Sequence, residues 1–343
     1  IRNYFHTIDL NPGFRIADEG EMRLLKQDTV EELLEEAHRE GRPEFVRFAE
    51  SYGSGNRGSG IGEMILKLYE YAVASPQPVR WLQECAAMYE LPENASFRDF
   101  VGEEALLGEL KTAAGDLKKQ IQKALAITGS PGGPLAYEEA LRSDEMLTDA
   151  LLECGTIEEY EALVTDVKFQ RLPSRRAKVM ADAEDELCEQ VMEIRNGVKE
   201  TLKGIVKQYF SLPGVTVMEQ MRCTAEHVRV YTELTLQFLN RLTEKKRKKN
   251  ILDFADQEHL ALQILTKEEN GELIPSEAAD IFADYFAEIM VDEYQDSNLV
   301  QEAILNSICA GRKGRENRFM VGDVKQSIYR FRQAEPGLFL DKY

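Results

Sequence analysis

The chain has 343 residues, of which 43% are hydrophobic and 30% are charged. This length suits about two domains of roughly 150 residues each, and the composition is typical of a globular protein rather than a disordered one. No apolar run in the sequence approaches the roughly 18 residues that a membrane-spanning helix needs, so we expect no membrane partner.

Charge and cysteine content narrow the functional classes further. The 61 acidic residues outnumber the 42 basic residues, for a formal net charge of −19. This charge argues against a protein that coats nucleic acid but permits a local positive track. The five cysteines are scattered and form no CxxC pair, so neither a disulfide scaffold nor a zinc ribbon is expected, and a cytoplasmic location fits best.

Helical periodicity dominates the first two thirds of the chain. Asp28 and Glu31 have the spacing of a capping box, and the apolar face that follows predicts a helix ending at Gly41. The longest pattern, Leu187–Tyr209, advances in three- and four-residue steps, which predicts a long helix paired with another in coiled-coil fashion. Further apolar patterns predict helices over residues 61–71, 106–121 and 228–242. Gly- and Pro-rich stretches predict loops over residues 53–60 and 129–134.

The last quarter of the chain has the pattern of a parallel α/β sheet. Two short apolar runs, Glu288–Val291 and Arg318–Val321, each lead to an acidic residue, and a helical pattern over Leu299–Ile308 separates them. Strand, helix, strand is the order of a parallel α/β unit, in which ligands gather at the carboxyl ends of the strands. We therefore expect Asp292 and Asp323 at one such site, and a largely helical region inserted into part of an α/β domain.

The segment Val291–Asp296 (VDEYQD) delivers two adjacent carboxylates to the end of the first strand. Asp292 could hold Mg²⁺ while Glu293 polarises a water molecule that attacks a phosphate. Gln295 could hydrogen-bond that water or the phosphate without adding negative charge. An acidic pair at a strand end is also common as a solvated turn, so the pair by itself leaves both interpretations open.

The segment Val321–Arg332 (VGDVKQSIYRFR) begins about thirty residues after the acids, the length of one strand–helix–strand unit. Gly322 permits a tight turn, and Gln326 could reach a phosphate. Tyr329 and Phe331 offer rings on which the bases of a single strand could stack. Ordinary packing of aromatic residues at a strand edge is the alternative.

The third segment, Ile251–Asp256 (ILDFAD), directly follows the basic run Lys245–Lys249 (KKRKK). A cationic turn beside an aromatic residue, here Phe254, suits contact with a phosphate and a base. The basic run is also typical of a solvated helix end, where lysines interact favourably with the helix dipole.

Together these segments resemble the motifs of superfamily-one DNA helicases of the UvrD/Rep/PcrA type. LDFAD, VDEYQDSN and GDVKQSIYRFRQA occur here in the order and spacing of that family. Within that family, the chain most closely resembles the helicase–nuclease A subunits, the AddA (RexA) subfamily. This resemblance lies in the segment VGDVKQSIYRFR, the large helical region and the opening PGFRIADE.

The resemblance implies roles for residues around the expected ATP site. Asp292 matches the family's Mg²⁺-associated acid, and Glu293 matches its catalytic base. Gln295 matches a coupling glutamine. Gln326 matches the sensor of the γ-phosphate, and Asp323 lies in the same ATP-coupling motif.

The resemblance also implies a DNA-binding side. Tyr329 and Phe331 match residues near single-stranded DNA, and Phe254 matches a further DNA contact. Arg332 matches the arginine that links the ATP site with the DNA site.

By the same resemblance, residues 1–24 and 226–343 are expected in the first RecA-like motor domain, domain 1A, which has the P-loop NTPase fold. Residues 25–225 are expected to form an all-α insertion, domain 1B. The phosphate-binding motif GxxxxGK[ST] does not occur in the chain, because GSGNRGSG at 53–60 lacks the Lys. We therefore expect an internal fragment of a longer protein that is inactive as an ATPase by itself.

For the longer protein, the resemblance implies an ATP- and Mg²⁺-dependent helicase with a nuclease domain that processes double-stranded DNA ends in break repair by recombination. The expected partners are single- and double-stranded DNA and an AddB-type protein, in a bacterial cytoplasm and associated with the nucleoid. Two alternatives remain, a UvrD-like helicase without a nuclease and a non-catalytic helical module that binds DNA or a partner.

Overall fold

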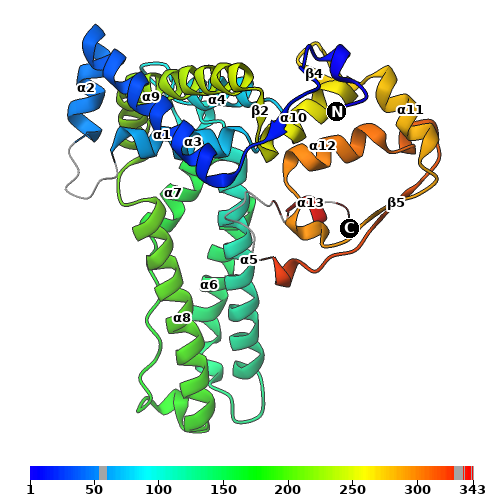
Figure 1. Ribbon diagram of the computed structural model, residues 1–343. Helices are drawn as coiled ribbons and strands as arrows, with labels where there is room; N and C mark the ends of the chain where they lie inside the picture. Colours follow the sequence, from blue (N-terminus) through cyan, green and yellow to red (C-terminus); the bar gives the residue numbers. More distant parts are fainter. Residues whose placement is uncertain (54–59, 328–334, 336, 341, 343) are drawn as a thin grey trace. The chain divides into compact units, whose positions relative to one another are not determined.

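The computed structural model describes residues 1–53, 60–327, 335, 337–340 and 342. It is mostly helical with small sheets (Figure 1). Its contacts divide the chain into two compact units. Unit 1 comprises Ile1–Ala87 and Glu226–Tyr343, and unit 2 comprises Met88–Ala225.

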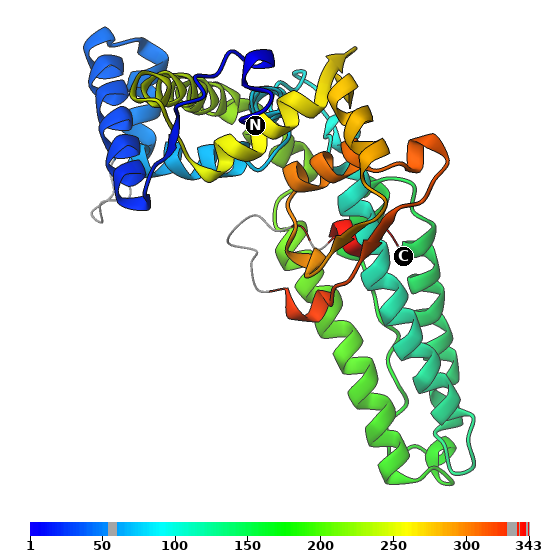
Figure 2. The ribbon, with the colours of Figure 1, turned by 45° about the vertical axis from the view of Figure 1, so that its right-hand side comes forward.

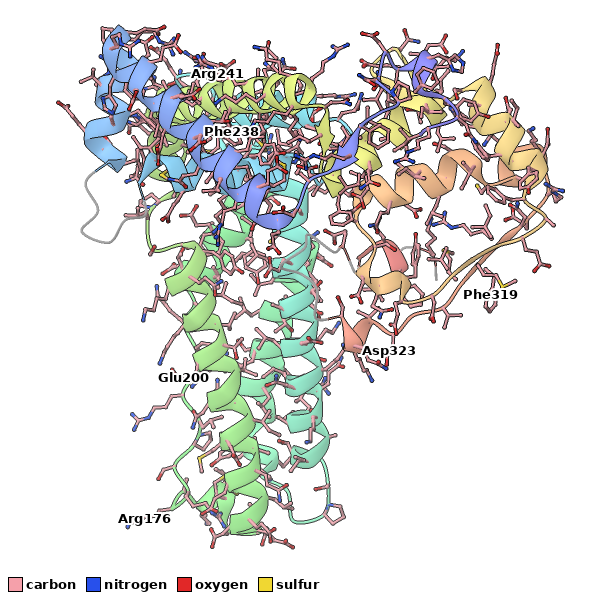
Figure 3. All side chains as sticks on the ribbon, viewed as in Figure 1. Arg176, Glu200, Phe238, Arg241, Phe319 and Asp323 are labelled. Carbon is pink, nitrogen blue, oxygen red and sulfur yellow. The ribbon has the colours of Figure 1, made fainter. Side chains whose placement is uncertain are left out.

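Unit 1 contains the first helices of the chain together with the last quarter. Its helices are α1 (Glu19–Glu40), α2 (Pro43–Tyr52), α3 (Ile61–Ala72), α4 (Pro78–Ala87), the later part of α9 (Gly214–Lys249), α10 (Phe254–Leu265), α11 (Glu277–Tyr285), α12 (Leu299–Ile308) and α13 (Gly337–Leu340). Leu33 of α1 and Phe48 of α2 share one apolar core with Leu234 and Phe238 of α9, the last of which is labelled in Figure 3. Residues 25–87, which we expected in the insertion, thus lie in unit 1.

The expected start of the first helix at Asp28 is wrong. The helix begins at Glu19, because the Asp18 side chain accepts a hydrogen bond from the Glu21 backbone N–H at 2.8 Å and so caps the helix well before Asp28. The expected end is confirmed, since Gly41 has φ of +62°, the left-handed conformation that commonly ends helices. The helices predicted within residues 61–71, 106–121, 187–209 and 228–242 are confirmed as α3, α5, α8 and α9.

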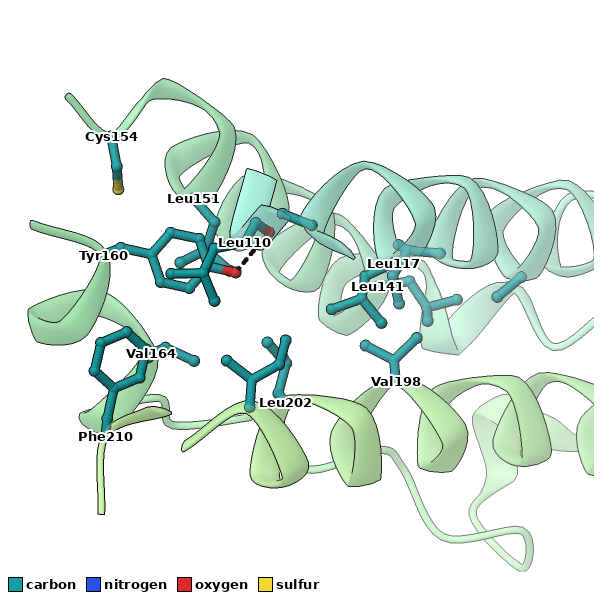
Figure 4. Packing of buried hydrophobic residues seen from close by; sticks show 14 of the residues in the cluster. Leu110, Leu117, Leu141, Leu151, Cys154, Tyr160, Val164, Val198, Leu202 and Phe210 are labelled. Carbon is teal, nitrogen blue, oxygen red and sulfur yellow. Dashed lines mark hydrogen bonds between the residues drawn. The ribbon is translucent and has the colours of Figure 1, made fainter. Parts of the chain in front are cut away.

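Helices form the core of unit 2. The long helices α5 (Glu103–Thr128), α6 (Glu138–Glu153) and α8 (Asp185–Tyr209) lie side by side (Figures 1 and 2). The shorter α7 (Ile157–Thr165) packs against all three. Apolar residues of the four helices fill the space between them, and the Tyr160 hydroxyl donates to the Leu110 carbonyl at 3.2 Å (Figure 4). The loop predicted at 129–134 is confirmed. In the loop predicted at 53–60, residues 54–59 lie outside the described residues.

A buried ion pair crosses the core of unit 2. The Arg195 guanidinium, 1% exposed, donates to both oxygens of Asp144 at 2.5 and 3.1 Å. It also donates to the Gln170 carbonyl at 2.9 Å and lies over the Phe169 ring. The pair therefore fixes the chain that follows α7 onto α6 and α8.

Three two-stranded sheets lie among the described residues, all in unit 1. Strand β1 (Arg15–Ile16) pairs in parallel with β2 (Ile251–Leu252), and β3 (Thr266–Glu269) pairs in antiparallel fashion with β4 (Glu272–Pro275). Strands β5 (Ile289–Val291) and β6 (Arg318–Met320) are parallel, with α12 between them in sequence. The predicted strand–helix–strand unit is thus confirmed, whereas the antiparallel hairpin was not foreseen.

None of the helices in the described part of the chain is both long enough and apolar enough to cross a membrane.

Replacing Arg195 by Met should destabilise unit 2 by about 3–5 kcal/mol, because the Asp144 carboxylate would stay buried without its charge partner. Urea unfolding of the chain, followed by circular dichroism, measures the loss. The double variant Arg195→Met/Asp144→Leu should recover much of it. A double variant that is no more stable than the single one would show that the unpaired charge is not the cause.

Candidate functional site

The acidic turn, residues 292–296, follows β5 and is hydrogen-bonded to the segment that follows β6. Val321 donates its backbone N–H to Val291 O at 2.9 Å, and Tyr294 donates its backbone N–H to Val321 O at 2.9 Å. These bonds continue the parallel ladder past the last strand residues. The carboxyl ends of both strands therefore lie side by side. Asp323, labelled in Figure 3, lies just beyond the end of β6.

Glu293 has an uncommon backbone conformation, with φ of +49° and ψ of +41°. A residue other than Gly in this left-handed region costs of order 1 kcal/mol, and such residues cluster at functional sites. The Asp292 carboxylate stabilises this conformation by accepting the Glu293 backbone N–H at 2.9 Å. Both side chains remain exposed to solvent.

A buried amide joins the two strand ends. Gln295, 1% exposed, donates from Nε2 to Glu293 Oε2 at 2.6 Å and accepts from the Asp323 backbone N–H at 2.9 Å. Gln326 in turn donates from Nε2 to Asp323 Oδ2 at 2.9 Å. The structure thus brings Glu293, Gln295, Asp323 and Gln326 into one continuous chain of hydrogen bonds.

Gly322 is needed for this contact, but not for the expected reason. Its φ lies outside the left-handed region, so a tight turn does not require glycine there. A Cβ at this position would instead collide with Gln295 Oε1. Only glycine lets the backbone after β6 approach the buried amide this closely.

A second buried network lies beneath the turn. The Tyr294 hydroxyl donates to the Glu302 carboxylate of α12 and accepts from Arg318 of β6 at 2.8 Å. Arg318 also pairs with Glu302, and Lys342 pairs with its other oxygen at 2.6 Å. Sequence reasoning missed this network, although a Glu on the apolar face of a predicted helix was a signal for it.

The network shifts two pKa values in opposite directions. Burial, followed by the hydrogen bond to Glu302, raises the pKa of Tyr294 well above its ordinary range. Burial alone would also raise the pKa of Glu302, but hydrogen bonds from Arg318, Lys342 and Tyr294 outweigh it, so this pKa lies below its ordinary value. Glu302 is therefore ionised and stabilised by its partners at neutral pH.

Phe254 lies apart from this hydrogen-bonded chain. It is the first residue of α10 and is 78% exposed, directly after Asp253, whose side chain caps the helix. Its ring lines a cavity of about 940 Å³ that Asp296 and Asn298 also line. The structure therefore places Phe254 on the same cavity as the last residue of the acidic turn and the capping residue of α12.

The basic run before Phe254 is largely engaged within the chain. Lys246 is 4% exposed and lies 3.2 Å from Asp253 Oδ2 and 2.5 Å from Asp256 Oδ1. Lys245 pairs with Glu32, and Arg247 pairs with Asp9. The run thus serves to anchor the end of α9 and the start of α10, and its cations are less available to a phosphate than the sequence indicated.

Three predicted residues, Tyr329, Phe331 and Arg332, lie outside the described residues. Within the part of the chain that the structure does describe, no group of three or more His, Cys, Asp or Glu side chains could enclose a metal ion.

The sequence matches the UvrD/REP helicase N-terminal domain over residues 1–343, and the chain belongs to this family. It is similar along its whole length to proteins named as the A subunit of an ATP-dependent helicase/nuclease. Identity is 40% with the protein of Lachnoclostridium phytofermentans, 39% with that of Geobacillus kaustophilus and 35% with that of Clostridium acetobutylicum. The chain spans 25%, 28% and 28% of these three relatives, about a quarter of their length.

Replacing Glu302 by Gln should destabilise the chain at pH 7 by about 1.5–3 kcal/mol, because charge-assisted hydrogen bonds are lost. Since the pKa of Glu302 is lowered by folding, its contribution is present above the ordinary value of 4.5 and is lost as the pH falls through the folded value. Urea unfolding at several pH values measures this.

Glu316→Gln, at an exposed carboxylate before β6, is the matched control and should change stability little at any pH. An equal difference between wild type and Glu302→Gln at pH 7 and at pH 3 would contradict the assignment.

Proposed function

We propose that this chain supplies part of the ATP site and part of the DNA contact of an ATP-dependent DNA helicase, within the A subunit of a helicase/nuclease that processes double-stranded DNA ends. The observation that carries the proposal is the hydrogen-bonded chain from Glu293 through Gln295 and Asp323 to Gln326. It holds an acidic pair after one parallel strand close to a polar side chain after the next, and phosphoryl transfer depends on such positioning of groups around the phosphate.

The proposal includes a division of the chain between two domains of the helicase family. Residues 1–24 and 226–343 would belong to the RecA-like motor domain 1A, and residues 25–225 to the helical insertion 1B. The parallel pairs β1–β2 and β5–β6 support the first assignment, and the all-helical core of unit 2 supports the second. Residues 25–87 would be the part of the insertion that packs on the motor domain.

Asp292 suits a Mg²⁺ ion that accompanies ATP. Its carboxylate is exposed at a strand end, and one oxygen already accepts a backbone N–H. Mg²⁺ is commonly held by one or two carboxylates while water and substrate phosphates complete its coordination, so this sparse donor set fits the ion. When bound, Mg²⁺ would neutralise charge that develops on the phosphates.

Glu293 is proposed as the base that orients and deprotonates the attacking water. Its carboxylate is exposed, and the Gln295 amide holds it in place from the buried side. Gln326 would contact the γ-phosphate. Loss of that phosphate would change the hydrogen bonds of Gln326, and the change would reach Glu293 through Asp323 and Gln295. Gln295 is thus proposed as a coupling residue.

On the DNA side, exposure of the Phe254 ring supports a stacking contact with a base of a single strand. Tyr329, Phe331 and Arg332 are proposed to extend this side on the strength of their motif alone. The partners would be single- and double-stranded DNA and an AddB-type protein. The expected location is the bacterial cytoplasm, in association with the nucleoid.

A non-catalytic helical module that binds DNA or a protein partner is the second candidate for this chain. The independent apolar core of unit 2 favours it, because an all-helical body of this kind needs no nucleotide to fold. DNA binding by the full-length protein that is the same with and without ATP would support the module and count against the motor.

Replacing Glu293 by Gln in the full-length protein should lower DNA-stimulated ATP turnover by about 10²-fold or more, because a positioned base contributes that much. A coupled assay of phosphate release measures it. Glu288→Gln, at an exposed carboxylate just before the same strand, is the matched control and should retain full turnover. Near-normal turnover by Glu293→Gln would remove Glu293 from the mechanism.

Phe254→Ala should weaken binding of a single-stranded oligonucleotide by about 1–3 kcal/mol, the contribution of one stacked base. Fluorescence anisotropy with the full-length protein measures the change. The control is Tyr285→Ala, since Tyr285 of α11 is also 78% exposed. Equal affinities of the two variants would show that Phe254 does not contact the strand.

A further inference from the structure

Glu258 of α10 holds the amino end of α12. Its Oε1 accepts from Gln301 Nε2 at 2.7 Å, and its Oε2 accepts from Asn298 Nδ2 at 3.4 Å. No motif in the sequence pointed to this residue. Its two partners belong to the helix that starts shortly after the acidic turn.

The two partners of Glu258 are the residues that begin α12. The Asn298 side chain accepts the Gln301 backbone N–H at 2.8 Å, and the Gln301 side chain accepts the Asn298 backbone N–H at 3.4 Å. This reciprocal pair is a capping box. Glu258 therefore fixes the position at which the chain leaves the acidic turn.

Only two residues, Asp296 and Ser297, separate the coupling glutamine Gln295 from Asn298. Ser297 is buried, and its carbonyl accepts the Glu335 backbone N–H at 3.0 Å. This short connection allows little independent movement of the cap of α12 and the Gln295 amide. A displacement of the cap would therefore be transmitted to the contact between Gln295 and Glu293.

On its other side, Glu258 follows Phe254 by four residues on the same helix. Residues at this spacing share one face of a helix, and both side chains line the cavity of about 940 Å³. The first turn of α10 is capped, because Asp253 and Asp256 form a capping box, and Lys246 of α9 contacts both acids. Because α10 is continuous from Phe254, a displacement of its first turn would also displace Glu258, one turn further along the helix.

We propose that Glu258 is a positioning residue that couples the exposed Phe254 surface to the acidic turn. A base stacked on Phe254 would set the orientation of α10, and Glu258 would transfer that orientation to the cap of α12 and to Gln295. This inference rests on the proposed function, since it assigns the route by which a bound single strand stimulates ATP turnover.

The conservative variant Glu258→Gln tests the route. It replaces the acceptor that faces Asn298 Nδ2 with an amide N–H₂ group, so two donors oppose each other. Adding Asn298→Asp restores one donor and one acceptor, and it keeps the side-chain oxygen that caps α12. The pair thus offers a rescue that depends on this contact alone.

The measurement is ATP turnover by the full-length protein without DNA and with a saturating single-stranded oligonucleotide. In Glu258→Gln, basal turnover and oligonucleotide affinity should stay within about twofold of wild type, while the stimulation by DNA should fall about fivefold or more. The double variant should regain most of the stimulation. Gln301→Met, which removes the stronger donor from the other side, should reproduce the loss.

Glu269→Gln, at an exposed carboxylate of the β3–β4 hairpin, is the matched control and should behave as wild type. Normal stimulation in Glu258→Gln would overturn the proposal. So would an equal loss of basal and stimulated turnover, or a double variant without rescue, since each indicates a purely structural role. Wild-type protein without DNA-stimulated turnover would instead reject the proposed function, and with it this route.

Discussion

The parallel pairing of β5 with β6 is the constraint on which the site depends, and the buried Gln295 amide extends that pairing beyond the strands. Backbone hydrogen bonds from Val321 and Tyr294 keep the two strand ends in register. The amide then satisfies one group from each end, a carboxylate oxygen of Glu293 and the backbone N–H of Asp323. Because a buried amide without partners is costly, both ends must stay together for either to be stable.

The surrounding structure supports this junction from two directions. Beneath it, Tyr294, Arg318 and Glu302 join the turn, β6 and α12 through buried charge-assisted hydrogen bonds. Beside it, Glu258 holds the start of α12 from α10. The strained Glu293 backbone is thus surrounded by contacts that fix its neighbours, which is the setting in which such a conformation persists.

Much of the site could be predicted from the sequence, because the patterns that indicate it lie close together in the chain. Short apolar runs that end in acids predicted the strand ends, and the order of strand, helix and strand predicted their parallel pairing. The hairpin at Asn270-Gly271 also has a local signal, since both residues adopt positive φ as Asn-Gly turns do, but acidic flanks concealed the strands.

Other features could not be predicted because they depend on partners distant in sequence. Nothing near Arg195 shows that Asp144 lies opposite it, and nothing near Glu258 points to Asn298. The run KKRKK was ambiguous partly for the same reason, since Lys245 pairs with Glu32 and Arg247 with Asp9. By contrast, the partners of Lys246, Asp253 and Asp256, lie close by in sequence. The start of α1 was predicted wrongly for another reason, because the capping residue Asp18 was overlooked in the sequence.

The most direct test of the proposed ATP site is a crystal structure of the full-length protein with Mg²⁺ and a non-hydrolysable ATP analogue. We expect Asp292 on the metal side of the triphosphate and Gln326 within hydrogen-bond distance of the terminal phosphate, with Gln295 still bridging the strand ends. A triphosphate bound away from these strand ends, or one that leaves Gln326 turned toward solvent, would contradict the proposal.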